Sequence, residues 1–452
     1  MSSGLRRMRK RILLLIQLAL WLICAALPDL RAQANRPSQA LRQVTEHRQK
    51  LFEKLRRDAE RLRSPSASSA TASTPVFAPD PDELDETLIK FAAERAAGFK
   101  IEDWKGEELQ MLGELYQMAE QFALAAEAFR AFLKSDLKSD SNLLMRSWAV
   151  SNVRARLIVS LIEAEQLDEA ERWIEGSEWI VAENPPALAA RTGLYKNLAV
   201  ALRDRGHYDK VATQADKGYK LANSLILSSN LVPPLLETTE RNQIVLAAMA
   251  VASYERVGRK READDLNELA LDFDFNHRPE LRSVYESELA AARLIGTPAP
   301  ELEVSRWIEG KERAPKSLNE LRGNVVLLNF WAMWSEPFVN TSPRLRALQS
   351  KYAGKGFEIV GVTKFYGRSD TEESLSREQE FKSLQNYRDR HQLTYPLAVG
   401  RMDDVTNEER YGVIGAPTMI LIDRRGVVRH VKRGAGEYRK LEKQIEKLLG
   451  EK

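Results

Sequence analysis

The segment FWAMWSEPFVN, residues 330–340, follows an apolar run, VVLLNF, and leads into a stretch with helical character, which places Ser335 at the junction. A serine hydroxyl at such a turn could act as a nucleophile in acyl transfer, but this chemistry needs a base within reach. None of the five histidines shows triad spacing or metal-ligand spacing. They are His47, His207, His277, His391 and His430. The sequence therefore favours a structural role for Ser335, as the N-cap of the following helix, over hydrolase chemistry.

The one cysteine of the chain, Cys24, lies in the apolar stretch ILLLIQLALWLICAAL, which is 16 residues long. Basic residues precede this stretch, and Ala32 and Ala34 after it fit the small-x-small pattern of signal-peptide cleavage. The stretch is shorter than the ~20 residues that span a bilayer. We expect residues 1–34 to be a signal peptide and the protein to be exported, periplasmic or otherwise extracytoplasmic, with an uncleaved membrane anchor as the alternative. After cleavage the chain would have no thiol and no thiol chemistry of its own.

The charge of the chain is nearly balanced. It has 68 Lys and Arg against 65 Asp and Glu, but the first 34 residues hold six basic residues and one acid, which leaves 62 basic against 64 acidic. This balance gives no electrostatic reason to expect nucleic-acid binding. The sequence shows no glycine-rich phosphate loop and no calcium-loop spacing, and we expect neither a cofactor nor a metal ion.

Three segments of different composition precede the C-terminal third. Residues 35–63 are basic and polar, which is typical of a solvated helix, although apolar residues near heptad spacing leave a coiled coil as the alternative. Residues 64–82, SPSASSATASTPVFAPDPD, are rich in Ser, Ala, Thr and Pro and predict a disordered linker. Residues 83–292 carry long amphipathic runs rich in Ala, Leu and Glu, which predict a helical domain.

Part of this helical segment resembles a tetratricopeptide repeat. In LQMLGELYQMAEQFALAAEAFRAFLK the matching residues are Leu109, Leu112, Gly113, Tyr116, Ala125, Phe129 and Phe132. In that repeat, small residues let two antiparallel helices approach closely and large residues fill the seam between them. Looser copies follow at a period of roughly 45 residues. We expect a degenerate array of helical hairpins whose concave face binds a protein segment, with a plain helical spacer as the alternative.

From Gly296 the pattern changes to strands that alternate with helices. The strand VVLLNF is followed by a helix and the strand FEIVGVT, then by a polar helical insertion at 371–391 and the stretch YPLAVG. The last two strands form a hairpin around DRRG and precede a final helix. This order, βαβ and then ββα, predicts an α/β thioredoxin-fold domain over residues 296–452.

The C-terminal third resembles the TlpA/ResA-like branch of the thioredoxin superfamily, also called redoxin or AhpC/TSA-like. The matching motifs are GTPAPELEV, LRGNVVLLNFWAMW, the helical insertion before YPL, YGVIGAPT and LIDRRG, and together they cover about 155 residues. The resemblance implies a thiol–disulfide oxidoreductase with two cysteines separated by two residues. In this chain those positions hold Ser335 and Phe338. The position of a glutamate that often assists the thiols holds Thr341, so the parts that perform the chemistry are absent.

The resemblance also implies a place for a bound peptide. Pro417 matches the family's cis-proline beside the active site, and the backbone of the preceding residue, here Ala416, pairs with a bound peptide in the manner of an added strand. Such pairing needs no thiol. We therefore expect a peptide-binding groove formed by Trp334, Ser335, Phe338, Ala416 and Pro417, with a purely structural role for Pro417 as the alternative.

Two functions follow from these residues. The first is an exported, non-catalytic protein, a pseudoenzyme, in which helical repeats and a thioredoxin-like domain bind or scaffold a protein or peptide partner. The second is a component of a thiol–disulfide oxidoreductase pathway whose partner supplies the thiols. Neither function gives the chain intrinsic thiol turnover, involves nucleic acid, or requires a membrane unless the N-terminal segment is uncleaved.

Overall fold

The computed structural model describes residues 36–62, 81–136, 143–176, 185–228, 231–271, 279–310, 314–315, 317–400, 406–436 and 438–451. The expected signal peptide (1–34) and most of the expected linker (64–82) lie outside the described residues. The chain divides into two compact units, the first ending at Gln166 and the second continuing from Leu167. The division of the sequence into a helical domain at 83–292 and a separate domain at 296–452 stays a prediction.

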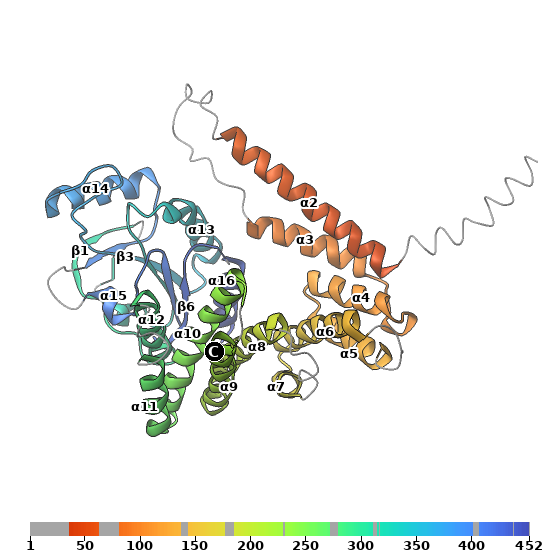
Figure 1. Cartoon of the computed structure of the whole chain (residues 1–452). Helices are drawn as coiled ribbons and strands as arrows, with labels where there is room; N and C mark the ends of the chain where they lie inside the picture. Colours follow the sequence, from red (N-terminus) through yellow and green to blue (C-terminus); the bar gives the residue numbers. More distant parts are fainter. Residues whose placement is uncertain are drawn as a thin grey trace, which may run out of the picture. The chain divides into compact units, whose positions relative to one another are not determined.

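The first unit is helical in its described part (Figure 1). Its helices are α2 (Pro37–Leu62), α3 (Pro81–Ala96), α4 (Glu107–Met118), α5 (Phe122–Asp136) and α6 (Leu143–Glu163). Gly113 on α4 faces the ring of Phe129 on α5, and a Cβ at this glycine would lie 2.5 Å from a ring carbon. The small residue therefore permits the close approach of two helices that the sequence predicted at this position.

Helix α2 departs from the expected solvated helix in its N-terminal half. Val44 is fully buried, and the helix contacts α4. The N–H and Oγ of Ser38 donate to the Glu108 carboxylate at 2.9 and 2.8 Å, and the ring of His47 stacks on Phe91 of α3 with centroids 4.4 Å apart. The expectation of a solvated helix is wrong for this half, because its apolar residues pack inside the unit.

The second unit begins with six further helices. They are α7 (Leu167–Glu175), α8 (Pro185–Arg203), α9 (Tyr208–Ser228), α10 (Pro233–Arg256), α11 (Lys260–Leu269) and α12 (Pro279–Leu294). Helix α9 packs on both α8 and α10. Gly218 makes this possible, since a Cβ there would lie 2.6 Å from the Cβ of Tyr195 on α8 and 3.0 Å from a methyl group of Leu246 on α10. Helix pairs of this kind fit the expected array, while its tetratricopeptide character stays a prediction.

A six-stranded mixed sheet forms the rest of the second unit. Its strands are β1 (Val304–Ile308), β2 (Val325–Phe330), β3 (Phe357–Thr363), β4 (Leu397–Gly400), β5 (Thr418–Ile422) and β6 (Val428–Arg433), in the order β1-β4-β3-β2-β5-β6. Strand β2 runs parallel to β3 and antiparallel to β5, and β5 and β6 form the hairpin expected around DRRG. The βαβ and ββα order of a thioredoxin-like domain is thereby confirmed.

The two faces of the sheet bury different side chains of the same strands. On β2, Val325 and Leu327 belong to a core with helices α13 (Glu336–Tyr352), α14 (Arg377–Arg390) and α16 (Tyr438–Gly450). The alternate residues Val326 and Leu328 belong to a second core that includes Leu294 and Ile295, at the end of α12. Because side chains alternate along a strand, an apolar run of this kind is typical of a strand covered on both faces.

Helix α12 is fastened to the sheet by polar contacts as well. The Ser287 hydroxyl donates to the Gly412 carbonyl at 2.7 Å, and the Arg433 guanidinium on β6 pairs with Glu288 at 2.8 Å. The helical segment from α8 to α12 and the thioredoxin-like sheet are therefore parts of one compact unit. Among the described residues, no helix has the length and apolar character needed to cross a membrane.

Candidate functional site

The turn between β2 and α13 carries the residues of the expected site. All six residues of β2 are buried, and so are Trp331, Ala332 and Met333 after it. Trp334 then emerges with 43% of its surface exposed, and Ser335 begins the helix. The short turn between β2 and α13 therefore lies at the carboxyl end of an inner strand of the sheet.

The Ser335 hydroxyl has a different partner from the one expected. Ser335 stands at the N-cap position of α13, as predicted, but its side chain makes no capping hydrogen bond. Its Oγ instead donates to the carbonyl oxygen of Ala416 at 3.1 Å, and the residue is 6% exposed. The prediction of a capping side chain is wrong, because the neighbouring carbonyl of the 413–417 loop offers an acceptor at the same place.

This contact also bears on acyl-transfer chemistry. A peptide carbonyl oxygen accepts a hydrogen bond but does not take up a proton at neutral pH, so Ala416 cannot serve as a general base. Among the described residues, the Ser335 hydroxyl has no hydrogen-bonded carboxylate or imidazole. The structure therefore offers Ser335 no activating group.

The loop before β5 faces this turn. The Ala416–Pro417 peptide bond is cis, as the sequence predicted. The loop is held from both sides, since the Thr418 hydroxyl donates to the Gly415 carbonyl at 2.7 Å and the Gly434 N–H donates to the Pro417 carbonyl at 2.8 Å. Pro417 is buried and Ala416 is half-buried. The loop thus presents the Ala416 backbone at the surface on a fixed support.

The Ala416 backbone keeps hydrogen-bonding capacity. Its carbonyl has two acceptor positions, and the Ser335 hydroxyl occupies one of them. Among the described residues, no acceptor is found for the Ala416 N–H. Ile414, two residues earlier, exposes 58% of its surface. An unpaired N–H and a half-used carbonyl beside an exposed aliphatic side chain are features that an added strand could engage.

Trp334 is supported by residues that the sequence did not suggest. Its ring meets the Tyr366 ring edge to face, with centroids 5.6 Å apart, and the Arg368 guanidinium lies 5.2 Å from the centre of the Trp334 ring. Burial, followed by the nearby Glu408 carboxylate, raises the pKa of the Tyr366 hydroxyl above its ordinary value. Tyr366 therefore stays neutral and acts as a packing surface. Only the three-dimensional fold reveals these neighbours, since they follow β3 and not β2.

A buried carboxylate holds the loop that carries Tyr366. Glu380 on α14 accepts the N–H of Tyr366 at 2.8 Å and the N–H of Gly367 at 2.9 Å, and it is 1% exposed. The insertion at 371–391 was expected to be polar, but Glu380 within it is buried. Helix α14 begins with an exposed capping box formed by Ser376 and Gln379, but the side chains of Glu380 and Phe381 that follow are buried.

Two further expected positions have different outcomes. Thr341, where the family often places a glutamate, is fully buried, and its Oγ1 accepts a 2.6 Å hydrogen bond from the Tyr438 hydroxyl of α16. This position now ties α13 to α16. Phe338 lies on the first turn of α13, and its side chain is outside the described part of the chain.

No cluster of three or more His, Cys, Asp or Glu side chains among the described residues could hold a metal ion.

Comparison with known proteins identifies this half of the second unit. Residues 295–431 match the model of the AhpC/TSA family. The thiol-disulfide oxidoreductase ResA of Geobacillus thermodenitrificans is 30% identical over 154 residues, which are 34% of this chain and 78% of that protein. The chain belongs to the AhpC/TSA family. Its redoxin domain is similar to thiol-disulfide oxidoreductases, while Ser335 and Phe338 leave it without their pair of cysteines.

Two other proteins are similar to the same C-terminal part of this chain. The thioredoxin-like protein YneN of Bacillus subtilis is 27% identical over 151 residues, which are 33% of this chain and 78% of that protein. A crystal structure described as a thiol:disulfide interchange protein DsbE of Chlorobium tepidum is 28% identical, with a TM-score of 0.28, and covers 34% of this chain and 98% of that one. These likenesses concern the C-terminal third of the chain.

Proposed function

We propose that the protein is a non-catalytic member of its family that binds an extended peptide segment of a partner protein. The surface would consist of Trp334, Ser335, Phe338, Ala416 and Pro417, with Ile414 added from the structure. The observation that supports this best is the state of Ala416, whose N–H is unpaired among the described residues and whose carbonyl is only half used.

The chemistry of the surface suits this role. Backbone pairing supplies affinity that depends little on sequence, and side-chain contacts beside it supply selectivity. Two exposed apolar side chains accompany the Ala416 backbone: Ile414 lies two residues before it, and Trp334 precedes Ser335, which donates to its carbonyl. Exposed aromatic and aliphatic side chains at the centre of a polar surface are typical of binding sites. The Arg368 guanidinium lies over Trp334 and pairs with the Glu373 carboxylate at 3.7 Å, which places a polar rim beside the aromatic ring.

The alternative function is that of a component in a thiol–disulfide oxidoreductase pathway, in which a partner protein supplies the thiols. Similarity to thiol-disulfide oxidoreductases favours it. Export after removal of residues 1–34, and a protein-binding role for the helical segment, belong to the same proposal. Under either function, the chain itself would not reduce disulfides, because oxygen at Ser335 has no disulfide chemistry.

Selection from a displayed library of extended peptides would test the binding surface. Ile414→Ser removes an exposed aliphatic side chain at the surface, and Leu227→Ser removes one that is 63% exposed on α9 of the same unit. We expect peptides whose affinity falls about tenfold in Ile414→Ser and stays within about twofold in Leu227→Ser. If no peptide is selected, or if both variants bind equally well, the surface is not a peptide site.

An insulin-reduction assay separates the two functions from intrinsic catalysis. We expect the wild-type chain to match a buffer blank and the Ser335→Cys/Phe338→Cys variant to gain activity, since it restores both thiols on one helical turn. Turnover by the wild type would contradict the non-catalytic assignment.

A further inference from the structure

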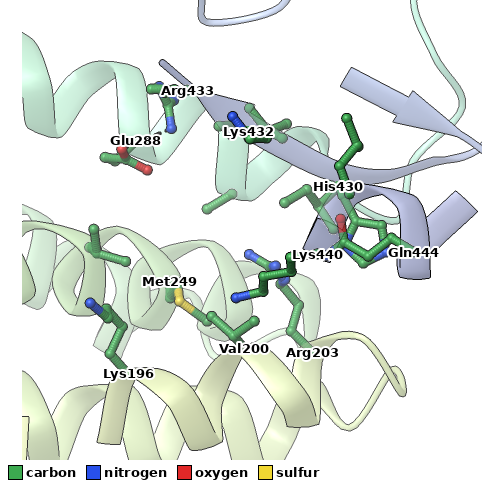
Figure 2. A pocket seen from close by; sticks show the side chains of 16 residues that line it. Lys196, Val200, Arg203, Met249, Glu288, His430, Lys432, Arg433, Lys440 and Gln444 are labelled. Atoms are coloured by element: carbon green, nitrogen blue, oxygen red, sulfur yellow. Dashed lines mark hydrogen bonds and ion pairs between the residues drawn. The ribbon is translucent and has the colours of Figure 1, made fainter. Parts of the chain in front are cut away.

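A cavity of about 350 Å³ lies inside the second unit, between the helices and the redoxin fold. Helices α8, α10, α12 and α16 and strand β6 line it, and Figure 2 shows Glu288 of α12 beside Arg433 of β6, across from Lys196 and Met249. The charged side chains that line it are five cations and one carboxylate. They are Lys196, Arg203, Lys432, Arg433, Lys440 and Glu288. The volume falls in the range of small-molecule sites, which is roughly 300–1,000 Å³.

The spacing of these residues places them on facing surfaces. Lys196, Val200 and Arg203 on α8 follow the i, i+4, i+7 pattern, which puts them on one face of the helix. Lys440 and Gln444 on α16 are an i, i+4 pair and also share a face. Figure 2 shows the Lys440 side chain extending from α16 toward the side formed by Val200 and Met249. Two helices distant in sequence thus direct cations into the same space.

The carboxylate of the lining is already used by one of the cations. Glu288 pairs with Arg433 at 2.8 Å, and the same guanidinium donates to the Ser287 carbonyl at 3.1 Å. Arg203 contacts Asp204, outside the lining, at 3.2 Å through one of its five N–H groups. Among the described residues, no carboxylate pairs with Lys440, which lines the cavity and is exposed. Lys196 already donates to Asn242 Oδ1 at 2.8 Å, and Lys432 donates to the Gly434 carbonyl at 2.7 Å. Lys440 and the buried Nε of Arg203 therefore keep hydrogen-bonding capacity for a ligand.

We propose that this cavity binds a small anion carrying two or more negative charges, of the polycarboxylate or phosphorylated class. Several fixed cations around a recessed volume raise the local concentration of an anion and give charge-assisted hydrogen bonds. Arg203 offers a planar fork suited to a carboxylate or phosphate group, and Lys440 closes the site as a mobile point charge. Gln444 and the neutral imidazole of His430 add uncharged polar contacts. Because the site joins α8 to α16, its ligand stabilises the helical segment against the redoxin fold.

Calorimetric titration of the full chain with pyrophosphate and with citrate at low salt would test the site. We expect saturable binding of at least one probe, weakened about tenfold by Lys440→Gln, since a hydrogen bond to a charged group contributes this much. The matched control is Lys443→Gln, which makes the same charge change on an exposed residue of the same helix outside the lining. It should change the affinity by less than about twofold. The relative affinity of the two probes tells a phosphorylated ligand from a polycarboxylate.

Three results would overturn this assignment. One is the absence of saturable binding of both probes. Another is equal weakening by Lys440→Gln and Lys443→Gln, which would mean that the probes respond to general surface charge only. The third is binding of poly-glutamate without binding of either small probe, which would identify an acidic polypeptide as the ligand. Thermal unfolding of both variants without ligand serves as the folding check, and we expect both to match the wild type because both side chains are exposed.

Discussion

Substitution of Ser335 by alanine separates the structural role of the hydroxyl from a role in binding. It deletes the 3.1 Å hydrogen bond to the Ala416 carbonyl and leaves the backbone of the turn unchanged. A hydrogen bond of this kind contributes about 0.5–1.5 kcal/mol to the free energy of unfolding. Ala416 is half-buried, so water can reach its freed carbonyl, and the loss should lie within that range and not above it.

The expected change is large enough to measure. A destabilisation of about 1 kcal/mol lowers the melting temperature of a unit of this size by about 2–4 °C. Peptide affinity should stay the same or increase by a few-fold, because the Ala416 carbonyl regains its second acceptor position. Thermal unfolding by circular dichroism and a titration with a selected peptide measure the two quantities.

A capping serine elsewhere in the redoxin fold supplies the control. Ser376→Ala removes the N-cap of α14 and should cost about 1 kcal/mol without any change in peptide affinity. Two results would refute the reasoning about Ser335. A loss above about 3 kcal/mol would mean that Ser335 belongs to a larger buried network. A loss of peptide affinity of more than about tenfold would mean that the hydroxyl itself contacts the ligand.

Three further predictions concern packing, pH and the support of Trp334. Gly218→Ala should destabilise the second unit by about 1–2 kcal/mol, because the added Cβ meets Tyr195. Gly193→Ala is the control, since its Cβ would lie 3.6 Å from the nearest atom, and it should stabilise the unit by about 0.5–1 kcal/mol. Urea unfolding measures both changes. Burial lowers the pKa of His430 to about 4, so the unfolded chain binds more protons between pH 6.5 and 4, and stability should fall by roughly 3 kcal/mol as the pH falls through that range. His430→Gln should remove this part of the pH dependence in buffers free of multivalent anions, and an unchanged profile would show that another group is responsible. Glu380→Gln should cost about 1–3 kcal/mol and weaken peptide binding, because the two N–H groups of the Tyr366 loop bind different carboxylate oxygens and the amide would place an NH2 donor against one of them. Full retention of stability and of peptide affinity would contradict the supporting role of this carboxylate.

Local patterns in the sequence were sufficient to predict much of the fold. The buried run VVLLNF and the hairpin around DRRG depend on residues that are neighbours in the chain, and the close approach at Gly113 lies within one pair of consecutive helices. Periodicity and turn chemistry therefore suffice to find them. The burial of Glu380 could not be read in the same way, because its partners precede α14 in a loop that composition alone describes as polar.

The site itself was predictable only in part. The position of Ser335 at the start of a helix followed from the turn, but its hydroxyl partner lies 81 residues away and depends on how two loops meet. The support of Trp334 by Tyr366 and Arg368 likewise depends on the pairing of β2 with β3. The basic cavity is the extreme case, because Lys196 and Lys440 face each other only after the helical segment packs on the redoxin fold. Long-range contacts of this kind leave no signal in a single sequence.

The most direct test of the account concerns the amide group of Ala416. The backbone amide signal of Ala416, followed by NMR in a selectively labelled chain, reports whether a selected peptide pairs with this residue. We expect the signal to shift on binding and its hydrogen exchange to slow, because the N–H gains an acceptor. A peptide that binds while the Ala416 amide stays unchanged, with shifts confined to the helices at 185–294, would contradict the claim that the redoxin domain is the binding module.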